Sequence, residues 1–144
     1  MCKKPFVVSI VILVGLASIA SATNYYVRPD GGSYGSEDGS DWSNAFDGFS
    51  DVVWGSSAGQ VGAGDTLYVA GGNYTSSITP AASGTSDSVR IVIRRATVAE
   101  HGTGTGWNSS FDAQVNLKSG DYVRVYQRSY ITVDGVTEYG IVTK

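Results

Sequence analysis

Short runs in which apolar and polar residues alternate recur along this chain. The cleanest runs place Leu67 and Val69, or Val123 and Val125, on one face, while polar residues or tyrosines occupy the other face. A period of two is typical of a β-strand that is buried on one side. The pattern predicts strands at residues 24–28, 66–69, 89–94, 114–117, 122–126, 130–133 and 140–143.

A different spacing occurs in residues 44–54. Phe46, Phe49 and Val52 recur there at helical intervals. Asn44 suits the N-cap of a helix, and Gly55 suits the position just after its last turn. The pattern predicts a short amphipathic helix over residues 44–54.

The predicted strands repeat in order. Residues 66–71 and 130–135 share a strand that ends at a glycine corner, and each is followed by a second short strand. Residues 89–117 form a looser copy with a long insertion at residues 97–113. Such units, spaced by roughly 20 to 40 residues, are typical of a solenoid whose coils stack on one another.

The amino-terminal segment has the pattern of an export signal. Lys3 and Lys4 precede an apolar run from Phe6 to Ile19, which ends at the small residues 20–22. The run is shorter than the roughly 20 residues needed to span a bilayer, which disfavours the alternative of a membrane anchor. We therefore expect cleavage after Ala22, a secreted or cell-surface location, and no membrane association after cleavage.

The charge and cysteine content of the mature chain exclude several kinds of binding partner and site. Removal of residues 1–22 leaves 8 basic and 13 acidic residues, a net charge of −5, and no cysteine. An acidic chain of this kind argues against nucleic acid and anionic membranes as partners. Without cysteine, the mature chain has neither a disulfide nor a thiolate metal site. The 19 glycines and 9 tyrosines are typical of a β protein.

Several motifs follow one another in a characteristic order. They are Tyr25-Tyr26-Val27, Trp42, Ala45-Phe46, Gly64-Asp65-Thr66, Gly72-Asn73-Tyr74, Gly84-Thr85, Arg95-Ala96 and Tyr130-Ile131-Thr132-Val133-Asp134-Gly135. In this order they resemble the opening of secreted right-handed parallel β-helix proteins of the pectin-lyase-like superfamily. The matched residues are architectural, so the resemblance is specific for the fold rather than for an activity.

The resemblance implies an all-β fold, a right-handed parallel β-helix of about three coils with a short N-terminal capping helix. It divides the chain into a signal peptide (1–22), a strand, acidic loop and capping helix (23–64), and the first coils (65–144). Proteins of this kind usually stack more coils, so we expect a piece of a longer solenoid.

The function implied is that of an extracellular carbohydrate-active protein, a polysaccharide lyase or glycoside hydrolase, in which this segment is mainly structural. The alternative is a non-catalytic surface or adhesion solenoid that binds glycans or other partners. Whether the chain is an enzyme stays open, and no catalytic residue is assigned. Lyases of this fold use basic residues to neutralise a uronate and remove its proton, and the candidates of that type are Lys118, Arg124 and Arg128. The one histidine, His101, has no nucleophile motif beside it.

The acidic, glycine-rich loop is the candidate metal site. Asp30, Asp38 and Asp41 would supply hard oxygen ligands to calcium, the one cofactor that the sequence suggests. The alternative, which we favour, is a solvated turn region whose side chains satisfy nearby backbone groups.

Aromatic side chains are the candidate contacts with a polysaccharide. Trp107, Tyr122 and Tyr126 would offer flat faces on which sugar rings stack. The alternative is that they pack between coils or under a loop.

Self-association is the last expectation. Ile131, Val133 and Ile141 lie in a final coil that no predicted element covers, so this coil is expected to recruit a second copy.

Overall fold

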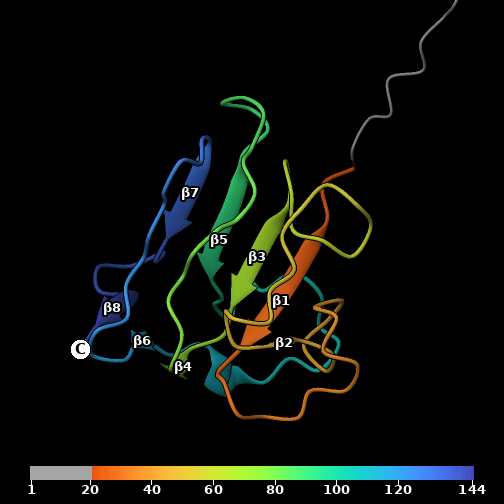
Figure 1. Ribbon diagram of the computed structural model, residues 1–144. Coiled ribbons are helices and arrows are strands. Elements are labelled where there is room, and N and C mark those ends of the chain that lie inside the picture. Colours follow the sequence, from red (N-terminus) through yellow and green to blue (C-terminus); the bar gives the residue numbers. More distant parts are fainter. Residues whose placement is uncertain (1–20) are drawn as a thin grey trace, which may run out of the picture.

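The computed structural model describes residues 21–144, so most of the predicted signal peptide lies outside the described residues. Within them the structure is almost entirely strands and loops (Figure 1). The elements are β1 (Asn24–Arg28), β2 (Phe46–Asp47), β3 (Thr66–Val69), β4 (Gly72–Tyr74), β5 (Ile91–Arg95), the 3-10 turn η1 (Ser109–Phe111), β6 (Val115–Leu117), β7 (Ile131–Asp134) and β8 (Ile141–Thr143).

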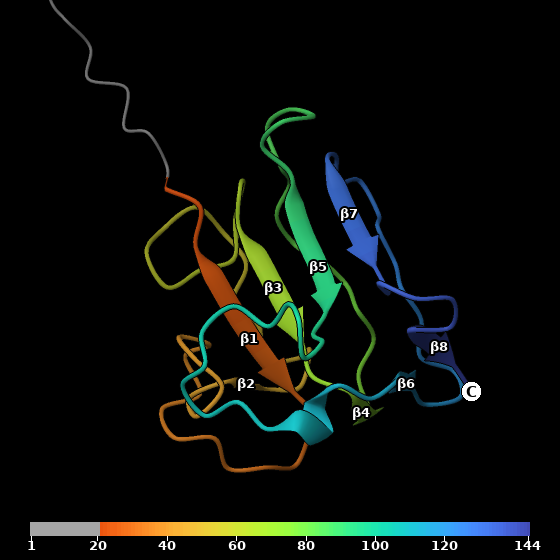
Figure 2. The ribbon, with the colours of Figure 1, turned by 180° about the vertical axis from the view of Figure 1, so that it is seen from behind.

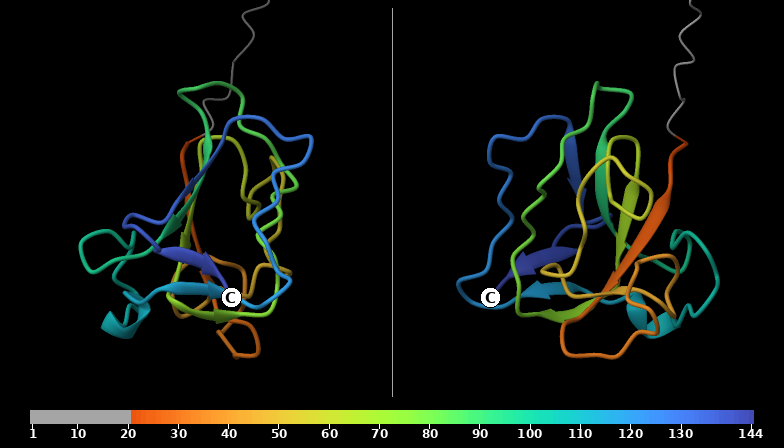
Figure 3. Two further views of the ribbon diagram at one scale, coloured as in Figure 1. Left: turned by 90° about the vertical axis from the view of Figure 1, so that its left-hand side faces the viewer. Right: turned by 45° about the vertical axis from the view of Figure 1, so that its right-hand side comes forward.

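The strands form two parallel sheets. One has the order β2-β1-β3-β5-β7 and the other the order β4-β6-β8. The chain passes from β3 to β4, from β5 to β6 and from β7 to β8, so it alternates between the sheets as it advances (Figure 3). An all-β chain with parallel sheets is therefore confirmed.

Along the strands, the apolar residues of the alternating pattern point into the protein and the residues between them point outward. Leu67, Ile93 and Leu117 are fully buried, while the residues beside them in each strand are more exposed. Stacked strands lie about 4.8 Å apart, so each buried side chain lies directly over its counterpart in the next strand. The core is thus a set of apolar columns that run along the stack.

The predicted helix over residues 44–54 is wrong. Phe46 and Asp47 form β2, which pairs in parallel with Val27 and Arg28 of β1. Gly48 then takes a positive φ of 78°, which is not helical and ends the segment in turns. Phe46, Phe49 and Val52 are nonetheless buried in the main core, so the apolar spacing that suggested a helix reflects burial from a strand and turns.

The other predicted strands are confirmed, with small shifts at their ends, except residues 122–126. That segment makes a single isolated parallel bridge, between Val123 and Ile78. Val123 and Val125 are both substantially exposed. Apolar and polar residues alternate in this segment, but its apolar face is not buried against the core, as it would be in a strand of the sheet.

Among residues 21–144 the structure contains no helix long and apolar enough to cross a membrane.

The last strand of each sheet has a free edge within the described residues. β7 pairs only with β5, and β8 pairs only with β6. Val133 of β7 is 36% exposed, and Ile131 and Ile141 are only partly buried against the core. Unpaired backbone groups next to apolar side chains form a surface on which another strand can add.

We predict that this edge mediates self-association of the mature chain. Replacement of both Val133 and Ile141 by Lys should shift sedimentation at micromolar concentration toward the monomer, because both positions continue inward-facing columns. The control carries Thr132→Lys and Val142→Lys, which lie on the same strands but face outward. A compact monomer of the unmodified chain, or equal effects of the two pairs, would show that the edge is not the contact.

Candidate functional site

A shallow groove of about 430 Å³ follows the outer face of the β4-β6-β8 sheet. Its polar lining comes from corresponding positions in successive strands: Asn73, Thr75, Asn116, Lys118, Ser119 and Lys144. Parallel pairing aligns Asn73 with Asn116 and Tyr74 with Leu117. The groove is therefore a product of strand register.

Two lysines stack at one side of this groove. Leu117 pairs with Thr143, so Lys118 and Lys144 continue the same register just beyond the strands. The backbone N–H of Lys118 donates to the Tyr74 carbonyl (3.0 Å), and that of Lys144 donates to the Leu117 carbonyl (3.0 Å). These bonds hold the two backbones about one strand spacing apart.

Among residues 21–144 neither lysine forms an ion pair, although the chain as a whole is acidic. Like charges on directly adjacent strand positions are unfavourable. An anion bound between Lys118 and Lys144 would relieve that repulsion.

Amide groups lie beside the lysines. Asn116 donates through Nδ2 to the Gln114 carbonyl (3.4 Å), while its buried Oδ1 has no hydrogen-bond partner in the structure. The exposed polar side chains that line the groove are instead those of Asn73, Thr75 and Ser119, which can bond to hydroxyl groups of a ligand. The groove thus combines two cations with exposed amide and hydroxyl groups.

Tyr74 fills the inner side of this sheet, where it is fully buried. Complete burial raises the pKa of Tyr74 well above its ordinary value, so its hydroxyl stays protonated. That hydroxyl donates to the Ala70 carbonyl at 2.8 Å, which fixes the corner between β3 and β4.

The predicted sugar-stacking residues do not lie together. Trp107 packs in an aromatic cluster, where its ring stacks on His101 (centroids 4.0 Å apart) and meets Trp42 edge-on (5.3 Å). Tyr122 and Tyr126 are 46% and 59% exposed on another part of the chain. Neither tyrosine lines the groove, and sugar stacking by these residues stays a prediction.

The aromatic cluster fastens the long insertion between β5 and β6 to the outside of the first sheet. This loop crosses in front of β1 and β3 in Figure 2. Trp42 donates through Nε1 to the His101 carbonyl (2.9 Å), and the Tyr26 hydroxyl accepts from the Thr103 N–H (2.7 Å). Burial raises the pKa of Tyr26, so its hydroxyl remains protonated near neutral pH. These contacts are structural.

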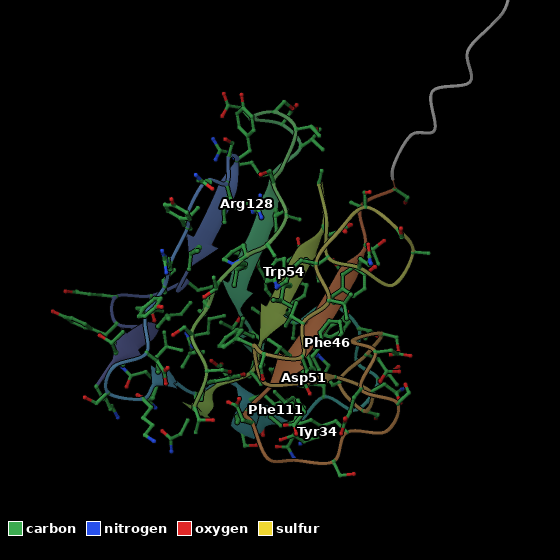
Figure 4. All side chains as sticks on the ribbon, in the orientation of Figure 1. Tyr34, Phe46, Asp51, Trp54, Phe111 and Arg128 are labelled. Carbon is green, nitrogen blue, oxygen red and sulfur yellow. The ribbon has the colours of Figure 1, made fainter. Side chains whose placement is uncertain are left out.

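Phe111 and Tyr34 flank Arg28 at the bottom of the same cluster (Figure 4). The guanidinium carbon of Arg28 lies 3.9 Å from the Tyr34 ring centre and 4.7 Å from that of Phe111. Cation–π contacts of this kind stabilise the folded loop.

The carboxylates of the acidic loop accept hydrogen bonds from other groups of the protein. Asp30 accepts from the Thr75 N–H and the Ser76 hydroxyl, both at 2.8 Å. Asp38 accepts from the Ser40 N–H (2.9 Å), and hydrogen bonds from the Ser40 hydroxyl and N–H lower the pKa of this carboxyl group.

Asp41 likewise accepts from the N–H groups of Ser43 and Asn44. In the described part of the chain, no three metal-ligating side chains gather at one point. Calcium binding by Asp30, Asp38 and Asp41 stays a prediction.

The basic candidates are dispersed as well. The guanidinium carbon of Arg124 lies 4.9 Å from the ring centre of Tyr126. Arg128 lies near the start of β7, far from the groove (Figure 4). Of the basic residues singled out from the sequence, Lys118 alone lines the groove.

Sequence reasoning missed two ion-pair groups, one centred on Arg94 and the other on Arg95. Arg94 pairs with Glu100 (2.5 Å) and Asp134 (3.4 Å) on the outside of β5 and β7. Arg95, at the end of β5, pairs with Asp112 (2.5 Å) and donates through Nε to the Ala113 carbonyl (2.8 Å). The second group ties both ends of the long insertion together.

Comparison of the chain with protein-family models, with curated proteins and with solved structures finds no match in any of the three.

We predict that Asp112 is required to anchor the insertion. Asp112→Ala should lower the free energy of unfolding by about 2 kcal/mol, because it leaves the largely buried guanidinium of Arg95 without its charged partner. The matched control, Asp87→Ala, removes the exposed ion pair with Arg90 and should cost less than about 1 kcal/mol. Denaturant unfolding followed by tryptophan fluorescence measures both, and equal losses would contradict the anchoring role.

Proposed function

We propose that this chain belongs to an extracellular right-handed parallel β-helix protein of the pectin-lyase-like type and that it binds an acidic polysaccharide. The parallel sheets and the alternation of the chain between them support the β-helix. The order of the architectural motifs, from Tyr25-Tyr26-Val27 to the strand ending at Gly135, supports the resemblance. The predicted signal peptide supports an extracellular or cell-surface location.

The stacked, unpaired lysines of the groove carry the functional proposal. Lys118 and Lys144 repeat at the strand spacing, which suits a polymer whose anionic groups also repeat. The exposed side chains of Asn73, Thr75 and Ser119 in the same lining add groups that can bond to the hydroxyls of a ligand. Together these groups match a polyuronate, which carries carboxylates and hydroxyls on each sugar.

The same lining favours binding over cleavage. No acidic side chain lines the groove, so it lacks the pair of carboxylates that glycoside hydrolysis uses. Glu100 and Asp134 are engaged with Arg94 on the other sheet. The function that the geometry supports best is therefore that of a glycan-binding β-helix, the alternative raised from the sequence, with no cofactor required.

The test is binding of the mature protein to polygalacturonate. Joint replacement of Lys118 and Lys144 by Ala should weaken binding about tenfold and flatten its dependence on salt, since each exposed charge contact contributes at most about 1 kcal/mol. The matched control, Arg128→Ala, removes a positive charge far from the groove and should leave the affinity within twofold. Dextran, a neutral glucan, should bind no variant measurably.

Equal weakening by the lysine pair and by Arg128→Ala would refute the groove as the binding site. Release of unsaturated uronate from polygalacturonate by the purified protein would show catalysis and overturn the binding-only function.

A further inference from the structure

Asp65 is a buried carboxylate without a charged partner. Asp65 and Arg95 are the charged residues buried in the described part of the chain, each 8% exposed. Arg95 has its partner in Asp112, whereas within residues 21–144 Asp65 forms no ion pair. A buried charge is costly unless a partner compensates it, so the setting of Asp65 calls for an explanation.

Two backbone N–H groups bind this carboxylate. Oδ2 accepts from Gly62 and Oδ1 accepts from Thr23, both at 2.8 Å. Thr23 immediately precedes β1 and Asp65 immediately precedes β3, and the Thr66 N–H donates to the Thr23 carbonyl (3.0 Å). Strand register therefore holds the nitrogen of Thr23 against Asp65.

Thr23 is also the residue that the cleavage pattern makes the first of the mature chain. Residues 21–23 are exposed, and Ser21, Thr23 and Asp65 line a hollow of about 390 Å³ at this end of the molecule. The bond between Ala22 and Thr23 is thus open to a peptidase, while the nitrogen on its far side already contacts Asp65.

We propose that processing after Ala22 turns the Thr23 nitrogen into the missing partner of Asp65. Hydrolysis adds water across the Ala22–Thr23 peptide bond: Ala22 leaves with a carboxylate, and the nitrogen stays on Thr23 and is protonated to an ammonium. A neutral amide donor then becomes a cation, so a direct attraction between opposite charges is added to the hydrogen bond that the carboxylate already accepts.

The mature amino terminus is therefore a structural element of the fold. It neutralises Asp65 and fixes the start of β1, to which both β2 and β3 are paired. Before cleavage the same nitrogen carries no charge, so the precursor lacks this contribution. Processing in this way both releases the chain and completes its first strand.

The other ionisable groups around Asp65 do not replace this partner. Tyr25 lies on the neighbouring strand, and burial, followed by the charge of Asp65, raises the pKa of its hydroxyl, which stays neutral. Arg90, which follows in the next coil, forms its ion pair with Asp87. The Thr23 ammonium is the cation that this site receives.

The test compares chains whose first residue is set by release from a cleavable fusion. Free and N-acetylated forms that begin at Thr23 are unfolded in denaturant at pH 6.5, where an α-amino group is protonated. Acetylation should lower the folding equilibrium constant about tenfold, because it removes the charge beside Asp65. The matched pair of free and acetylated chains begins one residue earlier, at Ala22. In that pair, acetylation should change the folding equilibrium constant less than twofold.

Asp65→Asn in the Thr23 form should abolish the effect of acetylation, whereas Asp87→Asn should preserve it. If Asp65→Asn does not fold, the two acetylation comparisons still decide, because they use the unaltered sequence. Equal effects of acetylation at Thr23 and at Ala22, or no effect at either, would overturn the proposal. Sequencing of the exported protein should give Thr23 as its first residue, and any other start would overturn it as well.

Discussion

Parallel hydrogen bonding between the backbones of successive strands is the interaction on which the rest of this structure depends. It aligns Tyr25 with Leu67, Leu67 with Ile93, and Ile93 with Val133 across four strands of one sheet. Each strand satisfies the polar backbone groups of its neighbour, and the aligned side chains form continuous apolar columns. A chain without disulfides obtains its stability from this combination, in which each coil supports the next.

The same register also arranges the outside of the molecule. On one sheet it brings Arg94 beside Asp134, where opposite charges attract. On the other sheet it stacks Lys118 and Lys144, where like charges repel and no acidic side chain lines the groove. The first arrangement is a pair of opposite charges, whereas the second leaves two like charges side by side, which is why we propose that it binds an anion. At the start of the stack, register holds Thr23 against Asp65 in the same way.

Strand positions could be predicted from the sequence because a period of two is a local signal. Leu67 and Val69, for example, identify β3 without any knowledge of its neighbours. The helix predicted over residues 44–54 was wrong for a related reason. Turns around Gly48 bury Phe46, Phe49 and Val52, the same residues that a helix would bury. Burial and helical periodicity coincide there, and sequence alone does not separate them.

The candidate site was only partly predictable. Lys118 was identified by its chemistry, but its neighbour Lys144 is 26 positions away in the chain, and only the pairing of β6 with β8 brings them together. The aromatic candidates failed to converge for the same reason, since Trp107 is held in a loop cluster by contacts with Trp42 and His101 that no local pattern encodes. Local periodicity predicts elements, whereas sites depend on register.

Register is therefore the claim to test, and nuclear magnetic resonance measures it directly. Scalar couplings across hydrogen bonds report which N–H donates to which carbonyl. The account predicts a coupling from the Lys118 N–H to the Tyr74 carbonyl, and another from the Lys144 N–H to the Leu117 carbonyl. Couplings shifted by one residue would turn the lysines away from the groove, and an antiparallel pattern would contradict the stacked parallel strands altogether.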